Sequence, residues 1–229
     1  MLKLDRAAVI APACLAEYDY NQQTWDDFRR PCKRQLRHAL FQLQGIPGVT
    51  SEEAKEYGLR CAYCESAIYH KGHIEHFRRK NRKHPNGYPE LTFEWNNFFL
   101  ACGSTHHCGH YKDRRDAPLY DPDMLIKPDE HDPEYFLYFH STGEVRARSK
   151  LSEEEAHCAS ETIRVFGLDN NALEGARANA VRSYRKINDG DLAELASWDE
   201  ADRVAYLHGE IEATRWHPYA TTIRHFLQA

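Results

Sequence analysis

Two cysteine pairs enclose a histidine-rich segment of the chain, and their spacing is typical of metal ligands. The first pair is Cys61 and Cys64, and the second is Cys102 and Cys108. Four thiolates complete the tetrahedral coordination of Zn²⁺, so no position is left for water or substrate. We therefore predict a structural zinc site. The alternative is that the two pairs are unrelated buried thiols.

The side chains between the two pairs have the chemistry needed to hydrolyse a phosphodiester. That reaction needs a water activated as nucleophile and a divalent cation, such as Mg²⁺ or Mn²⁺, that neutralises the phosphate. In the segment His73-Ile-Glu75-His76, consecutive residues of an extended chain point to opposite faces. Glu75 and His76 can therefore take separate roles, one on the ion and one on the water. For His76 the alternative is a structural, hydrogen-bonded histidine.

A second imidazole for the ion has to come from outside this segment. His107 and His110 flank Cys108, the last predicted zinc ligand. If Cys108 shares a zinc ion with Cys61, its neighbours return toward Glu75, so either histidine could be the ligand. A solvated helix histidine is the alternative for His110.

Charge is distributed unevenly along the 229 residues. The net charge of −5 excludes a globally basic coat protein of nucleic acid. Between Arg60 and Lys83, however, seven Lys or Arg residues stand against two acidic ones. A local basic patch on an acidic chain is typical of a phosphate-binding face confined to one part of the molecule. A solvated surface without a ligand is the alternative.

The remaining cysteines and the apolar segments indicate the compartment. The N-terminus has no run resembling the apolar core of a signal peptide, and no stretch is long enough to span a bilayer. We therefore expect a cytoplasmic, reducing location, where paired cysteines more often bind metal than form disulfides. Cys14, Cys32 and Cys158 are isolated in the sequence and are expected to be small buried thiols.

The elements around these residues predict an α+β fold in three parts. The main N-terminal helix is expected to begin at Thr24, to be interrupted or restarted at Pro31, and to end before Gly45. The three parts are an N-terminal helical segment, a module that carries the motifs and a C-terminal region of hairpin and helices: residues 1–57, 58–118 and 119–229.

The C-terminal region is predicted to contain one hairpin followed by helices. Two β-prone runs, 135–139 and 144–147, flank a turn that contains Gly143. Ser152 and Glu155 form a capping box that starts a helix. Further helices are expected from the apolar spacing within residues 173–187 and 192–211, and Phe226 and Leu227 are expected to close a final short helix after Pro218.

The order of these motifs resembles that of the HNH endonucleases, whose ββα-metal fold carries a zinc knuckle in many members. The resemblance is closer to one branch, the PtuB-like HNH nuclease subunits of Septu and retron-associated anti-phage systems, and covers residues 10–187. Five motifs carry it: Cys61-Ala-Tyr-Cys64-Glu, His73-Ile-Glu-His-Phe-Arg, Tyr88-Pro-Glu-Leu, Trp95-Asn-Asn and Cys108-Gly-His-Tyr-Lys112. It implies a ββα-metal module embedded in a mostly helical protein, and a nucleic-acid substrate, with DNA preferred over RNA.

The resemblance also implies roles for individual residues. His76 matches the general base of the family, and Glu75 stands where many members have the acidic ligand of the catalytic ion. Asn97 matches the central asparagine, which in this fold fixes the loop that aims the base. A turn or cap is the alternative role for Asn97.

One position departs from the family pattern. Many HNH proteins have His or Asn directly after the last cysteine, but this chain has Gly109 there. We therefore expect His110 to be the second ligand of the catalytic ion, with His107 as the reserve. Phosphate contacts of the substrate are expected from Arg78, Arg79, Lys80 and Lys112.

The resemblance implies partners as well. Proteins of this branch are paired with an ATPase of the ABC or SMC-like kind (PtuA-type), and in retron systems also with a reverse transcriptase and its DNA product. The hairpin and helices within residues 119–229 are expected to dock that ATPase, which would restrain the nuclease. No membrane partner is expected.

Two other functions fit parts of the sequence. A non-catalytic zinc-ribbon module that binds nucleic acid or another protein would use the same cysteines and basic patch, but it would not need Glu75, His76 and His110 to converge. A zinc deaminase would use His73-Ile-Glu75 as its H-x-E motif. That motif must precede a P-C-x-x-C, whereas here the C-x-x-C comes first.

Overall fold

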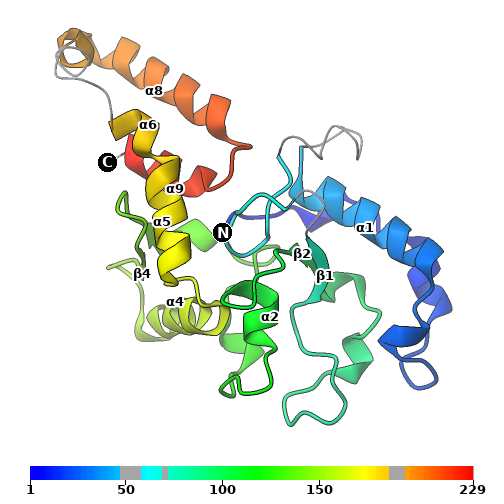
Figure 1. The fold of residues 1–229 in the computed structure, drawn as a ribbon. Helices are drawn as coiled ribbons and strands as arrows, with labels where there is room; N and C mark the ends of the chain where they lie inside the picture. Colours follow the sequence, from blue (N-terminus) through cyan, green and yellow to red (C-terminus); the bar gives the residue numbers. More distant parts are fainter. Residues whose placement is uncertain (47–57, 69–71, 186–193, 229) are drawn as a thin grey trace.

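The computed structural model describes residues 1–46, 58–68, 72–185 and 194–228, and the fold is mixed α+β, as predicted (Figure 1). The helices are α1 (Arg30–Gln44), α2 (Cys108–Lys112), α3 (Pro133–Phe136), α4 (Glu153–Phe166), α5 (Asn171–Ala180), α6 (Arg182–Arg185), α8 (Glu200–Thr214) and α9 (Ala220–Leu227). The strands are β1 (His73–His76), β2 (Phe98–Ala101), β3 (Leu137–Phe139) and β4 (Val145–Ala147). Short 3-10 turns occur at Arg6–Ala8, Ala13–Glu17, Trp25–Asp27, Pro89–Leu91, Trp95–Asn97 and Pro122–Met124.

The β1–β2 sheet lies at the centre of the part of the chain that carries the motifs. Its antiparallel register puts Glu75 opposite Phe99 and His76 opposite Phe98. β2 is apolar and buried at every position, and α1 packs against it. Gln44, at the end of α1, is buried and exchanges hydrogen bonds with the N–H and the carbonyl of Leu100, at 2.6 and 2.9 Å. These bonds fix the helix to the sheet.

The N-terminal helix begins later than predicted. Thr24 begins only a short 3-10 turn, where its N–H donates to the carboxylate of Asp27 at 2.7 Å. α1 begins at Arg30, with Pro31 in its first turn, and ends at Gly45. Proline lacks an N–H and has a fixed φ, so it is tolerated at the start of a helix and disrupts its interior. The helix therefore begins in the turn that contains Pro31, where the sequence predicted an interruption or a restart, and not at Thr24.

The expectation that Cys14 and Cys32 are free thiols is wrong. They form a disulfide, with Cα atoms 5.9 Å apart, that joins the 3-10 turn containing Cys14 to the first turn of α1. Their separation of 18 residues gives no local signal of pairing. The chain between them folds back because the rings of Tyr18 and Phe28 pack edge to face, 4.8 Å apart. Cys158 is a free, half-buried thiol.

The C-terminal hairpin is confirmed but is shorter than predicted. β3 and β4 pair in antiparallel fashion, and Gly143 in the turn has φ of +98°, which glycine adopts without a steric cost. Tyr135 and Phe136 belong to α3 and not to the strand. The difference arises because Asp132 caps this helical turn and Pro133 begins it.

The helices after the hairpin follow the predicted order. α4 begins with the predicted capping box of Ser152 and Glu155, and it ends at Gly167 in the left-handed conformation. The helix predicted over 173–187 is divided into α5 and α6 at Val181, and its predicted end lies outside the described residues. α8 packs on α9 (Figure 1).

One hydrophobic core runs through all three predicted parts of the chain. It includes Leu36 of α1, Phe99 of β2 and Phe166 of α4. Phe166 stacks on Tyr63, beside the first cysteine pair, with ring centroids 4.1 Å apart. Residues 119–229 are therefore not a separate appendage, because α4 completes the core of the motif-bearing module. Every helix in the part of the chain that the structure describes is too short or too polar to cross a membrane.

Candidate metal centre and catalytic residues

The four predicted zinc ligands come from three short segments around the β1–β2 sheet. Cys61 and Cys64 lie in a turn closed by a hydrogen bond from the N–H of Glu65 to the carbonyl of Cys61, at 3.1 Å. Cys102 follows β2, and Cys108 is the first residue of α2. Strand pairing and the start of α2 therefore bring cysteines from distant parts of the sequence to one point.

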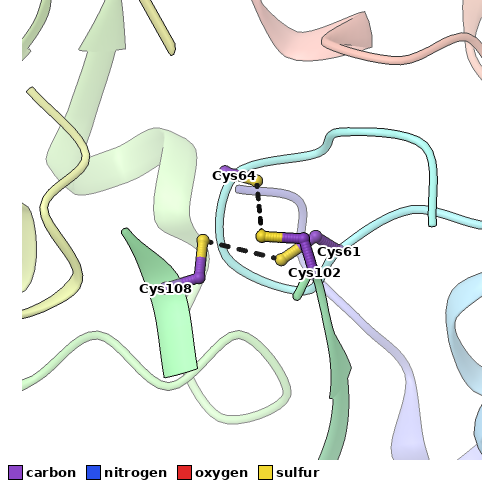
Figure 2. A group of neighbouring side chains, drawn as sticks. All are labelled: Cys61, Cys64, Cys102 and Cys108. Carbon is purple, nitrogen blue, oxygen red and sulfur yellow. Dashed lines mark hydrogen bonds between the residues drawn. The ribbon is translucent and has the colours of Figure 1, made fainter. Parts of the chain in front are cut away.

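The four sulfurs converge in one buried cluster (Figure 2). All four Sγ atoms lie within 4.8 Å of one another, with 3.7 Å between Cys61 and Cys108 and 3.9 Å between Cys64 and Cys102. Zn–S bonds of about 2.3 Å in a tetrahedron place the sulfurs roughly 3.8 Å apart. The cysteines could therefore hold a metal ion such as zinc, and a cation would offset the repulsion between buried thiolates.

His107 belongs to this cluster and not to the site at Glu75. Its Nδ1 lies 3.2 Å from the sulfur of Cys108 and 3.5 Å from the sulfur of Cys102. A ring N–H directed at a thiolate stabilises the negative charge of that metal ligand. The reserve assignment of His107 to the catalytic ion is therefore withdrawn.

Glu75 lies on the face of β1 that meets α2. Its Oε1 is 3.0 Å from the ammonium of Lys112, and its Oε2 is 3.2 Å from Nε2 of His73. Burial alone would raise the pKa of this carboxyl, but the charge of Lys112 and the hydrogen bond with His73 lower it to about 2. Gly109 makes room for the side chain, because a β-carbon there would collide with the carboxylate. This contact requires glycine at position 109.

His110 approaches Glu75 through His73. The two imidazole rings are stacked, with centroids 4.0 Å apart and planes 7° apart. His73 was not among the predicted ligands of the catalytic ion, although the i, i+2 spacing on a strand places it on the same face as Glu75. One carboxylate and two imidazoles could hold a divalent ion here after side-chain rotation. In the described segments, the four cysteines alone already have ligand atoms at metal-binding spacing.

His76 lies on the other face of β1. Its side chain is 3% exposed and packs edge-on against Trp25 and Phe98, at 4.6 and 4.9 Å between ring centroids. Its Nε2 is 3.0 Å from the carbonyl oxygen of Thr92. Since a carbonyl only accepts, Nε2 must carry the proton, and Nδ1 is left as the base. Burial, and then the charge of Lys80, lower the pKa of His76 to about 3, so the ring is neutral.

Asn97 holds the loop that follows β1. Its Oδ1 accepts from the N–H of Arg78 at 2.7 Å, and its Nδ2 donates to the carbonyls of Arg78 and Leu91 at 3.0 and 3.1 Å. The carbonyl of Asn97 also accepts from the N–H of Phe77 at 2.9 Å. Asn97 therefore positions the backbone next to His76.

Two of the four predicted phosphate ligands are buried in ion pairs instead. Lys112 is 1% exposed, and its ammonium contacts the carboxylates of Glu75 and Asp113 at 3.0 and 2.7 Å. The guanidinium of Arg79 lies 2.8 Å from Asp113 and also donates to the carbonyl of Lys112. Both side chains are almost fully enclosed and their charges are already paired, so neither is free to contact a phosphate as predicted.

The other two predicted phosphate ligands are more accessible. Arg78 pairs with the exposed carboxylate of Asp123, and its guanidinium lies over the ring of Tyr88 at 5.1 Å. Lys80 is half-buried, with its ammonium 5.6 Å from the centre of the Trp25 ring. No carboxylate of the described residues lies within ion-pair distance of Lys80. Lys80 is therefore the one of the four whose charge is not already matched.

The deaminase interpretation uses His73, the histidine of the H-x-E motif, as a zinc ligand. The buried cluster consists of four cysteines, and His73 lies at Glu75. That alternative therefore has no support from the geometry.

Comparisons with protein-family models and with curated proteins find no match for this chain. The functional assignment therefore depends on the residues and distances given above.

Proposed function

We propose that this protein is a metal-dependent HNH-type endonuclease with a structural zinc ion. The observation that carries the proposal is that two neighbouring residues of β1, Glu75 and His76, offer different chemical groups on opposite faces of the strand. On one face, Glu75 is an ionised carboxylate in contact with His73, and the ring of His110 stacks on that of His73. His76, the next residue, is a neutral imidazole whose Nδ1 is free to accept a proton. A hydrolase that attacks phosphodiesters needs both functions close together.

Each residue then has a chemical task. Glu75, His110 and His73 would hold a divalent ion, Mg²⁺ or Mn²⁺, which would neutralise charge on the phosphate and the leaving oxygen. His76 accepts the proton of the attacking water at Nδ1, and the hydrogen bond from its Nε2 to Thr92 stabilises the charged ring that results. The four-cysteine site fixes α2 against β2, and so holds His110 near Glu75.

The biological setting follows from the resemblance to PtuB-like subunits. We place the chain as the effector nuclease of an anti-phage system, with an ABC or SMC-like ATPase as partner and, where a retron is present, its reverse transcriptase and DNA. Co-expression with that ATPase and co-purification test this part. An ATPase that does not co-purify with the full chain would contradict it.

The test of the proposed activity compares two carboxylate variants. We expect the purified protein to cleave DNA, or RNA, only when Mg²⁺ or Mn²⁺ is added. Glu75→Gln keeps the shape of the side chain and should lower the rate by at least about a hundredfold, because a metal ligand loses its charge. Glu90→Gln changes an exposed carboxylate in a 3-10 turn and should have no effect. Equal rates for Glu75→Gln and the parent would reject the nuclease proposal.

The non-catalytic zinc-ribbon module is the second candidate, and two observations favour it. Lys112 already neutralises Glu75 at 3.0 Å, and His76 is almost entirely buried. Both features suit a structural network. Tight binding of nucleic acid without cleavage under any divalent ion would identify this function.

A further inference from the structure

Basic side chains gather in a cleft that is lined on one side by the Arg79–Asp113 ion pair. Its volume is about 400 Å³. One wall is the loop after β1, and the other is the segment after α2, so the two walls come from distant parts of the chain. We call it the 80–115 cleft, and its charged and imidazole-bearing lining residues are Arg79, Lys80, Lys83, His84, Asp113, Arg114 and Arg115.

The charge of this cleft is strongly positive. Its one carboxylate, Asp113, is already in contact with Arg79 at 2.8 Å and with Lys112 at 2.7 Å. Lys83 and Arg115 are exposed and have no carboxylate within ion-pair distance among the described residues. Three cations, those two and Lys80, therefore face the cleft without a matching anion.

Lys80 makes the strongest case for a missing anion. Its ammonium is largely removed from water, and burial lowers its pKa. A half-buried cation without a paired carboxylate is unfavourable unless an anion from outside binds to it. The packing of Lys80 against Trp25 holds the ammonium in position, at 5.6 Å from the ring centre. Such an arrangement suits an oxyanion ligand.

One buried cation, Lys112, links the cleft to the proposed catalytic residues. Lys112 contacts Glu75 with the same ammonium that contacts Asp113, the carboxylate in the wall of the cleft. The fields of Lys80 and Glu75 both act on His76. A strand with one phosphate at Glu75 and His76 would therefore pass this cleft with a neighbouring phosphate.

The geometry points to the 80–115 cleft as the site that binds a non-cleaved phosphodiester of the substrate strand, held by Lys80 and Lys83 from one wall and Arg115 from the other. This inference rests on the proposed nuclease function. Of the four predicted phosphate contacts it keeps Lys80, sets aside the paired Arg79 and Lys112, and adds Lys83 and Arg115.

The experiment measures binding apart from cleavage. Fluorescence anisotropy is recorded with short DNA and RNA oligonucleotides, in the His76→Ala background and without divalent ions, over a series of salt concentrations. The test protein carries Lys83→Gln and Arg115→Gln, one change on each wall and neither in the catalytic set. The control carries Lys150→Gln and Arg182→Gln, which remove the same charge from exposed positions of the C-terminal region.

We expect the test protein to bind on the order of tenfold more weakly than its parent. Its salt dependence, the slope of log K against log salt, should fall by about 0.7–0.9 for each lost phosphate contact. The control should match the parent in both measurements. An unchanged slope and affinity in the test protein, or no binding by the parent at low salt, would overturn the assignment of the cleft.

The outcomes separate the cleft from the nuclease proposal. Weakened binding in the test protein, together with no cleavage by the wild-type chain under any ion, keeps the cleft and rejects the nuclease. Metal-dependent cleavage by the wild-type chain, together with unchanged binding in the test protein, keeps the nuclease and rejects the cleft. Inorganic phosphate is titrated as a second probe. If it binds below about millimolar concentration while oligonucleotides do not bind, the site takes a free anion and the strand assignment fails.

Discussion

At the scale of single residues, the candidate site contains a row of alternating charges that is buried except at Asp113. Glu75 contacts Lys112, Lys112 contacts Asp113, and Asp113 contacts Arg79. Each charge is matched by its neighbours, so the network is stable only as a unit. An added divalent ion at Glu75 would compete directly with the ammonium of Lys112.

Removal of Lys112 should therefore expose this competition. Lys112→Met keeps most of the apolar side chain but leaves the buried Glu75 without its cation, while Asp113 keeps Arg79, and we expect a loss of about 3–5 kcal/mol in the free energy of unfolding. Mg²⁺ or Mn²⁺ should restore part of that loss. Urea unfolding with and without the ion measures both effects. Lys150→Met, at an exposed position, is the control. A fully stable Lys112→Met protein would show that the network is not needed for folding.

A substitution of His76 should change the rate of cleavage without changing the bound zinc. His76→Ala removes the proposed base, and we expect the cleavage rate to fall roughly 10²–10⁴-fold. The zinc content should not change, because the ring contacts aromatic side chains and the Thr92 carbonyl and none of the four cysteines. His38→Ala, at an exposed position of α1, should cleave normally. Full activity in His76→Ala would remove the general-base assignment.

At the scale of elements, the four-cysteine cluster connects pieces too short to be stable alone. β1 and β2 have four residues each, and α2 has five. A two-stranded sheet and a helix of one turn are marginal in water without further support. The cluster ties the turn at Cys61, the end of β2 and the start of α2 to one point.

Loss of one thiolate should therefore destabilise the whole module. Cys61→Ser leaves three thiolates in a buried cluster, and we expect weaker zinc binding and a loss of several kcal/mol in stability, because binding of a structural metal is coupled to folding. Zinc analysis and thermal unfolding of the purified protein measure these effects. Cys158→Ser is the matched control, since Cys158 is a free thiol outside the cluster. A parent protein that folds without any bound metal would contradict the coupling.

Sequence reasoning succeeded where a local pattern fixes the structure. The capping box at Ser152 and the four cysteines depend on residue type and spacing, and the structure has both where they were expected. The partners in space were not predictable. The Cys14–Cys32 disulfide depends on a tertiary fold-back, and the burial of Lys112 depends on which face of α2 meets β1.

At the scale of the whole molecule, the C-terminal region is part of one folded unit. Phe166 of α4 is fully buried against Tyr63 and Phe77. A truncation at Ser152 would therefore remove core of the zinc-bearing module as well as any docking surface, and it cannot test docking alone. The N-terminus belongs to the same unit, because the ammonium of Met1 pairs with Glu65, whose carboxylate also accepts from the N–H of Thr221 at 3.0 Å.

His225 joins α9 to the hairpin of β3 and β4, and we expect its protonation to make the stability of the protein depend on pH. His225 is buried on β3, and its Nδ1 accepts from the N–H of Phe139 at 3.1 Å, which requires that nitrogen to be unprotonated. Glu134 lies 3.5 Å from the other ring nitrogen, with Arg148 at 3.4 Å. Burial first, and then the charges of Arg148 and Arg224, lower the pKa of His225 from 6.5 to about 4. The folded protein therefore holds the ring of His225 in its neutral form.

The sign of the resulting pH effect follows from that lowered pKa. Above pH 6.5 neither state binds the proton, and the contribution to stability is fully present. Between pH 6.5 and about 4 the unfolded chain takes up a proton at this residue and the folded chain does not, so stability falls as the pH falls. From pH 7 to pH 5 the expected loss from this one residue is about 2 kcal/mol. His225→Gln cannot titrate, so its unfolding free energy should change less over that range by about this amount. Urea unfolding of both proteins at the two pH values measures the difference. If the parent and His225→Gln lose the same free energy of unfolding between pH 7 and pH 5, the ring is already protonated, or accessible to water, in the folded state.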